Sequence, residues 1–169
     1  MRSTVILLAL LAGANQAARA AEPALMPMPV KMTAASGKFL INANFVVDAG
    51  GPAAARLTPV VSWFLARVSR QTAVPLSPQP PAPADAKRLV IQCAGGPAYP
   101  TLGEDESYTR DVSDTEARLK SATVEGTIHG LATFAQLIQP GPDGFQVAGV
   151  HIEDRPRYQW RGQIGRAHV

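Results

Sequence analysis

The sequence has little of the residue types from which many specialised sites are built. Its 169 residues include one cysteine, 6% aromatic residues and 17% charged residues. A single cysteine excludes an internal disulfide framework and a zinc site built from cysteines. The sequence has no glycine-rich phosphate loop and no nucleophile elbow, and we expect neither a metal nor an organic cofactor. The chain is also too short for a complete (β/α)8 barrel, which takes about 250 residues.

Outside its terminal segments, the sequence also has no excess of positive or negative charge. The chain has 16 Lys and Arg against 13 Asp and Glu, a net charge of +3. Arg2, Arg19 and Arg166 lie in the terminal segments, and without them the basic residues equal the acidic residues in number. A neutral body offers no electrostatic footprint for nucleic acid, so we expect no nucleic-acid partner.

Residues 1–20 have the composition of a secretory signal peptide. Arg2 supplies a positive start, residues 5–12 are uncharged and apolar, and Ala18, Arg19 and Ala20 form a small-x-small cleavage site. The apolar run, about ten residues, is too short to span a bilayer. An uncleaved anchor or a buried helix is the alternative. We expect cleavage after Ala20, export to the periplasm or the extracellular space, and no membrane contact afterwards.

Residue periodicity predicts an α/β (α+β) fold. Apolar spacing of three and four residues predicts helices over residues 53–70 and 126–139. Strand composition predicts a hairpin or two short strands, a buried strand, a hairpin and a short pair of strands, at residues 37–48, 87–94, 107–123 and 144–152. This order predicts helices packed on one face of a mostly antiparallel or mixed sheet.

Prolines limit two of these segments. Pro59 lies inside the first predicted helix, where proline removes a donor and crowds the preceding turn. Either the helix begins there with Thr58 as its N-cap, or it bends there. Residues 75–83 hold five prolines, which predicts an exposed polyproline-like loop.

Acidic residues upstream of residue 150 form no site by their spacing. Glu104, Asp105 and Glu106 could supply a catalytic carboxylate pair or a cation site. Neighbours in one loop do not face a substrate from two chain positions, so we favour a solvated loop before a strand. Asp114 and Glu116 are typical of a turn.

Two further single residues have an ordinary structural interpretation. His129 has no histidine partner at i+4, so we interpret it as a packing or capping residue rather than a ligand. Cys93 lies in an apolar strand-like run and is interpreted as a small buried hydrophobe rather than a reactive thiol.

The densest group of functional residue types occupies residues 152–162, with three arginines, two acidic residues and two aromatic residues. Guanidinium groups and flat rings are what sugar recognition uses. A cluster of surface salt bridges at a domain junction explains the same composition. The residue types alone leave both interpretations open.

This stretch resembles glycoside hydrolase family 20, the β-N-acetylhexosaminidases. That family carries an Ile-x-Asp-x-Pro-Arg-(Phe/Tyr)-x-x-Arg-Gly run where its N-terminal domain meets a catalytic (β/α)8 barrel. The matching positions are Ile152, Asp154, Pro156, Arg157, Tyr158, Arg161 and Gly162. Weaker similarities lie upstream in the family's order, at residues 25–29, 105–108 and 126–137. The resemblance covers residues 24–162.

The resemblance implies a fold and an activity. Residues 21–152 would form the family's N-terminal accessory α/β domain, and residues 153–162 would begin its barrel. Arg161 matches the arginine that holds hydroxyls of the terminal sugar, a role that suits a bidentate fork. The implied reaction removes terminal non-reducing N-acetyl-β-D-hexosamine residues from an oligosaccharide or glycan. It is retaining and substrate-assisted: the 2-acetamido oxygen attacks the anomeric carbon, an Asp orients it, and a Glu is the general acid.

The sequence departs from the family after Gly162. The family's catalytic Asp-Glu pair has no counterpart here, so we expect no catalytic residue in this chain and no hydrolysis by it. The last six residues equal one reading frame of a common sequencing-library adapter. We therefore interpret residues 163–169 as a non-native tail, in which Arg166 and His168 have no function. The alternative, of another class, is a stand-alone secreted carbohydrate- or protein-binding module without catalytic activity.

Overall fold

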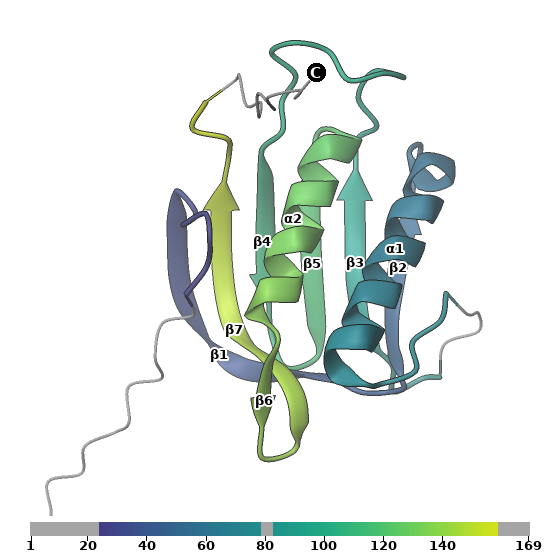
Figure 1. Ribbon diagram of the computed structural model, residues 1–169, viewed down its shortest axis with the longest axis vertical. Helices are drawn as coiled ribbons and strands as arrows, with labels where there is room; N and C mark the ends of the chain where they lie inside the picture. The colour runs from purple at the N-terminus through teal and green to yellow at the C-terminus, as the bar shows by residue number, and fades with distance from the viewer. Residues whose placement is uncertain (1–23, 79–82, 159–169) are drawn as a thin grey trace, which may run out of the picture.

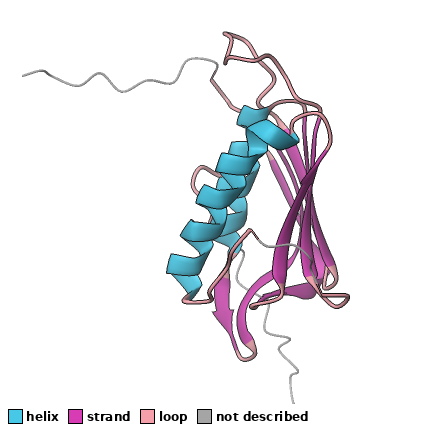
Figure 2. Cartoon of the chain, turned by 90° about the vertical axis from the view of Figure 1, so that its right-hand side faces the viewer, coloured by secondary structure: helices cyan, strands magenta, loops and turns pink. Residues whose placement is uncertain are grey.

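The computed structural model describes residues 24–78 and 83–158. In these residues one mixed sheet carries two helices on a single face (Figures 1 and 2). The elements, in chain order, are β1 (Lys31–Ile41), β2 (Phe45–Gly50), α1 (Ala54–Thr72), β3 (Lys87–Cys93), β4 (Tyr108–Val112), β5 (Glu116–Ser121), α2 (Val124–Leu137), β6 (Gln139–Gly141) and β7 (Gly144–Asp154). The predicted fold class is therefore confirmed.

The sheet combines a parallel half and an antiparallel half. Its strand order is β1-β7-β4-β5-β3-β2, and β6 pairs with β7 outside this path. Strands β2, β3 and β5 run parallel to one another. A parallel pair needs a long crossover, and α1 supplies it between β2 and β3. All pairings of β7 and the β4–β5 hairpin are antiparallel.

Residues 37–48 form two separate strands rather than a hairpin. β1 pairs with β7 and β2 pairs with β3, at opposite edges of the sheet. Figure 1 shows β1 curving beneath the sheet toward β2. Side chains on both sides of the break, among them Phe39 and Phe45, are buried in the same core. Their burial stabilises this long-range arrangement.

The predicted pair of strands over residues 144–152 is wrong, because β7 is one strand of 11 residues. Its alternation shifts by one residue between the buried Val147 and Val150. The shift is matched by an irregularity in β1 between Ala34 and Lys38. A Cβ at Gly149 would overlap the carbonyl oxygen of Ser36, so glycine permits this close approach.

Helix α1 begins before Pro59, so the predicted N-cap at Thr58 is wrong. Ala53 occupies that position, and the Thr58 hydroxyl instead donates to the Ala54 carbonyl at 3.2 Å. Pro59 leaves the Ala55 carbonyl without its helical donor. Both residues are exposed, so the cost of this lost hydrogen bond is smaller than it would be in the core. The predicted apolar face is confirmed, since five of its six residues are buried (Leu57, Val61, Phe64, Leu65 and Val68) and the sixth, Val60, is half-buried.

The core between the sheet and the helices is centred on four phenylalanines. Phe39, Phe45, Phe64 and Phe134 pack with ring centroids 5.9–6.4 Å apart. Each of these rings is at most 3% exposed. Cys93 is also buried and unpaired, as its interpretation as a small hydrophobe requires. Within the described residues, no helix has the length and apolarity needed to cross a membrane.

Arg110 is the one charged residue buried in the described part of this core. Alternation along β4 places it on the inward face with Tyr108 and Val112. Its Nη2 donates to the carbonyl oxygen of Gly130, and its guanidinium lies 4.8 Å from the centroid of the Phe134 ring. Its Nε and Nη1 have no hydrogen-bond partner among the described residues. Burial lowers the pKa of Arg110 to about 9.

We predict that Arg110→Met raises the free energy of unfolding by about 1 kcal/mol, because a buried cation without a counter-ion costs more than its single hydrogen bond returns. Denaturant unfolding of the purified protein measures this change. Arg88→Met, on the opposite face of the sheet, is the matched control and should change stability little. A loss of stability in Arg110→Met would contradict the prediction.

Candidate functional site

We call residues 25–29, 105–108, 126–137 and the described part of 152–162 the motif segments. They lie far apart in the sequence but line one cavity of about 400 Å³, which we call the junction cavity. Its walls include Pro27 and Met28, Glu106 and Tyr108, His129 and Thr133, and Asp154 and Tyr158. Figure 1 shows the end of β7, the start of β4 and the first turn of α2 at the same end of the molecule. The cavity therefore lies at the end of β7, beside residues 155–158 that follow this strand.

Asp154, the last residue of β7, is the central acceptor of the junction cavity. Its Oδ2 accepts from the Tyr108 hydroxyl at 3.1 Å, and its Oδ1 accepts from the Val30 backbone amide at 3.1 Å. The Tyr108 hydroxyl also lies 2.7 Å from Oγ1 of Thr133 on α2. Since the single tyrosine proton points to the carboxylate, Thr133 donates in that contact. Burial raises the pKa of Tyr108 to about 12, so the hydroxyl stays a donor at neutral pH.

Two further contacts lie on other sides of the cavity. His129 Nε2 lies 2.7 Å from Glu106 Oε2, which joins α2 to the segment before β4. The Met26 amide donates to Gln136 Oε1 at 3.0 Å. These contacts hold residues 24–30, which we call the opening segment, and the loop before β4 against α2. His129 therefore joins α2 to the loop before β4 through a polar contact, and 44% of its side chain is exposed.

The acidic triple lies in the loop before β4, as predicted, but its members serve separate local contacts. Glu104 Oε2 accepts from the Thr101 amide at 3.1 Å. Hydrogen bonds from the side chain and the amide of Ser107 lower the pKa of Asp105. Only Asp105 of the three is fully exposed; Glu104 and Glu106 are half-buried. The three carboxylates do not converge, and no described group of three His, Cys, Asp or Glu side chains could hold a metal.

The loop before β4 also sets the start of α2. Thr123 is the N-cap, and its hydroxyl accepts from the Gly126 amide at 3.1 Å and donates to the Asp105 carbonyl at 2.7 Å. A Cβ at Gly126 would lie 2.6 Å from the carbonyl oxygen of Ser107. Glycine at this position allows α2 to approach the loop closely. Asp114 lies in the turn between β4 and β5, as predicted, whereas Glu116 is the first residue of β5.

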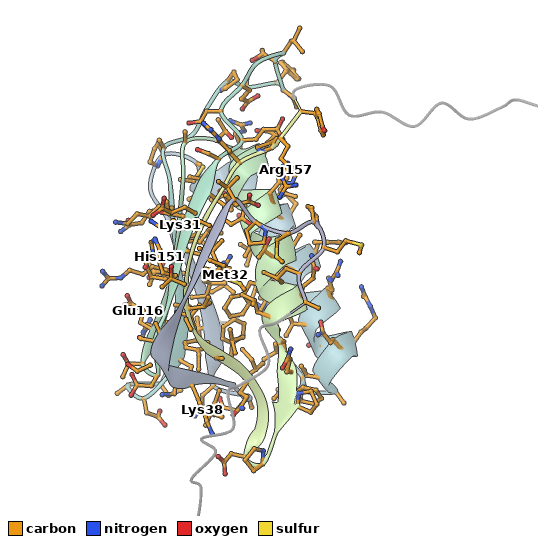
Figure 3. All side chains as sticks on the ribbon, turned by 90° about the vertical axis from the view of Figure 1, so that its left-hand side faces the viewer. Lys31, Met32, Lys38, Glu116, His151 and Arg157 are labelled. Atoms are coloured by element: carbon orange, nitrogen blue, oxygen red, sulfur yellow. The ribbon has the colours of Figure 1, made fainter. Side chains whose placement is uncertain are left out.

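A second polar cluster lies on the sheet face that carries no helix, on the same side as Lys31 (Figure 3). His151 Nδ1 lies 2.6 Å from Asp111 Oδ1, and its Nε2 lies 3.0 Å from Glu153 Oε1. Lys31 Nζ also contacts Glu153 Oε1 at 2.8 Å. The hydrogen bond to Asp111, then that to Glu153, raises the pKa of His151. The sequence indicates that residues 151 and 153 share a face, but not that Asp111 lies beside them.

Several predicted segments fall outside the described residues: the signal peptide (1–20), Arg161, and the tail (163–169). The motif is described as far as Tyr158, whose side chain is 74% exposed. Arg157, labelled in Figure 3, donates from Nη2 to the Met28 carbonyl at 3.4 Å. The described motif residues therefore contact the opening segment and β4.

Comparison with known proteins identifies relatives of this arrangement. A family model described as "beta-acetyl hexosaminidase like" matches residues 25–137. β-Hexosaminidase subunit alpha of Bos taurus is 40% identical over 77 residues, which cover 45% of this chain and 15% of that protein. The solved chitobiase of Flavobacterium johnsoniae is 31% identical with a TM-score of 0.67, covering 82% of this chain and 21% of that chain. A mutant β-hexosaminidase of Streptomyces plicatus, solved with its product GlcNAc, is 25% identical with a TM-score of 0.52 over 79% and 26% of the two chains.

We predict that His151 makes stability depend on pH. Its pKa in the folded state lies above the ordinary value of 6.5, so its protonated form stabilises the fold. That contribution is fully present below the unfolded pKa and is lost as the pH rises through the folded pKa. The difference in Tm between the wild type and His151→Gln should therefore shrink between about pH 5.5 and pH 8.5. A difference that stays constant over this range would contradict it.

We also predict that Gly126→Ala lowers the free energy of unfolding by about 1–2 kcal/mol, because the overlap with the Ser107 carbonyl outweighs the gain in helix propensity. Gly50→Ala is the matched control, since its Cβ would have no neighbour within 4 Å. Denaturant unfolding of the two variants compares the effects. Equal stability of the two variants would show that α2 moves away at no cost.

Proposed function

Because the chain belongs to the β-acetyl hexosaminidase-like family, we propose that residues 21–152 are the N-terminal accessory domain of an exported β-N-acetylhexosaminidase. Residues 153–162 begin the catalytic barrel of that enzyme. The observation that carries this proposal is the meeting of all the motif segments around the junction cavity, at the point where β7 ends. The signal peptide, residues 1–20, directs the enzyme to the periplasm or the extracellular space.

The proposed reaction of the whole enzyme is hydrolysis of terminal non-reducing N-acetyl-β-D-hexosamine residues in an oligosaccharide or glycan. The GlcNAc product bound to the Streptomyces plicatus relative supports this substrate class. In the proposed mechanism the 2-acetamido oxygen of the substrate attacks the anomeric carbon, an Asp orients the acetamido group, and the adjacent Glu protonates the leaving oxygen. Arg161 holds hydroxyls of the terminal sugar through its guanidinium fork.

The polypeptide of 169 residues is proposed to be inactive by itself. It spans 15% of the bovine subunit and 21% of the chitobiase chain. Acid–base and electrostatic catalysis require the general acid, the orienting carboxylate and the sugar-binding groups in one place. The Asp-Glu pair has no counterpart in the sequence, and the contacts of Asp154 are structural. The contribution of this part of the enzyme is to place the start of the barrel.

We predict that the full-length gene product releases nitrophenol from an aryl N-acetyl-β-D-glucosaminide and that residues 21–169 alone do not. Arg161→Lys in the full-length enzyme should raise KM by about tenfold or more, because lysine cannot form the bidentate contact. Steady-state kinetics measure both results. No release by the full-length product would favour the stand-alone binding module instead, and release by residues 21–169 would overturn the assignment of catalysis to later residues.

A further inference from the structure

We propose that the opening segment and the junction cavity together form the surface on which the catalytic barrel of the same protein docks. This docking surface consists of the exposed side chains of Met26, Met28, Val30 and Tyr158 and of the apolar walls of the cavity. The inference rests on the proposed function, which places a barrel after the accessory domain. Every residue of the surface itself lies in the described part of the chain.

Large apolar side chains are exposed together at this end of the domain. Met26 and Tyr158 are 84% and 74% exposed, and Met28 and Val30 are more than half exposed. Of the eight large apolar residues that are exposed in the described ranges, these four belong to the opening segment or to the walls of the junction cavity. Single exposed apolar residues are ordinary, but a group of them beside a cavity is typical of an interaction site.

The opening segment is bound to the domain through its backbone at every second residue. The amides of Met26 and Val30 donate to side chains of α2 and β7, and the carbonyl of Met28 accepts from a side chain that follows β7. Leu25 and Pro29 are buried. These contacts hold the three exposed side chains in a fixed outward arrangement. A surface that is ordered before binding loses less conformational entropy when a partner docks.

The polar groups of the junction cavity already have partners inside the domain. Asp154 accepts two hydrogen bonds, one of them from Tyr108. Thr133 binds the same tyrosine hydroxyl, and His129 contacts Glu106. Other walls are apolar, from two prolines, a methionine and an alanine. A sugar needs free hydrogen-bonding groups to fix its orientation, whereas a protein surface can cover such a cavity with apolar side chains. The cavity therefore favours a protein occupant over a sugar.

The place at which the chain continues identifies that occupant as the barrel. Residues 155–158 line the junction cavity, and Figure 1 shows the chain leaving β7 at this end of the sheet. A domain joined to the chain here lies beside the surface at an effective concentration of about millimolar order, which no free partner matches. This chain covers 15% of the bovine subunit and 21% of the chitobiase chain. A protein of their length has enough further chain to cover the whole surface.

Thiol labelling of the native full-length protein tests the docking directly. Met28→Cys places a thiol within the proposed surface. Tyr99→Cys is the matched control, because Tyr99 is 81% exposed and is not a wall of the junction cavity. The native Cys93 is buried, and the wild type supplies the background rate. We expect Met28→Cys to react with a maleimide at least about tenfold more slowly than Tyr99→Cys, because a docked thiol reacts only through local opening. In denaturant the two rates should be equal.

Met26→Cys repeats the measurement at a second position of the same surface and carries the test if Met28→Cys does not fold. Circular dichroism of each variant shows that it is folded. Slow labelling at residues 26 and 28 supports docking. Labelling of either position in a folded variant at the rate of residue 99 would overturn the inference.

The labelling result and the catalytic assay are read independently, so the two proposals can fail separately. Slow labelling in a full-length product that releases no nitrophenol would refute the proposed activity and still support docking of the domain that follows. Fast labelling in an active product would overturn the docking surface alone. Protection that disappears on dilution would show that a second copy of the protein covers the surface, and would overturn the assignment to the barrel.

Discussion

The register of β7 between β1 and β4 is the constraint on which the rest of this structure depends. It pairs Lys31 with Glu153 and Thr109 with the same residue from the other side, which brings the start of β1, the start of β4 and the end of β7 to one end of the sheet. A slip by one residue would turn the buried Val150 and Ile152 to the opposite face. It would also remove Asp154 from both of its donors. The hydrophobic pattern of β7 thus stabilises the sheet and forms the junction cavity at the same time.

Charged side chains are paired on one face of the sheet and lack a counter-ion among the described residues on the other. On the outer face, His151, Asp111, Glu153 and Lys31 neutralise one another across three strands, where water screens whatever imbalance is left. On the inner face, the partners of Arg110 among the described residues are the Gly130 carbonyl and the Phe134 ring. Burial of the Arg110 charge is unfavourable for folding, and the same loss of hydration lowers the pKa of Arg110. The inner face is therefore where a single substitution changes stability most.

Local periodicity predicted the elements whose partners lie nearby in the sequence. The apolar face of α1, the β4–β5 hairpin and the helix that became α2 were all recognisable, because spacing and short turns determine them. Of the two arrangements left open at residues 37–48, the structure has two separate strands, whereas the strand pair expected at residues 144–152 was wrong, and both outcomes have one reason. β1 pairs with β7, which lies more than 100 residues further along the chain, and this pairing separates β1 from β2. It also keeps β7 a single strand, because the irregularity in β1 between Ala34 and Lys38 lies opposite Gly149.

The sequence by itself determined the element types, the mixed α/β class and the family, because periodicity and short motifs are properties of neighbouring residues. It also marked Asp154 and Arg157 as motif positions. Only the tertiary structure decided what those residues contact: Asp154 binds Tyr108 and Val30, and Arg157 binds Met28. The same holds for Arg110 under Phe134 and for His151 beside Asp111. These contacts depend on strand order and register, which follow from burying the whole apolar surface at once and which no local segment encodes.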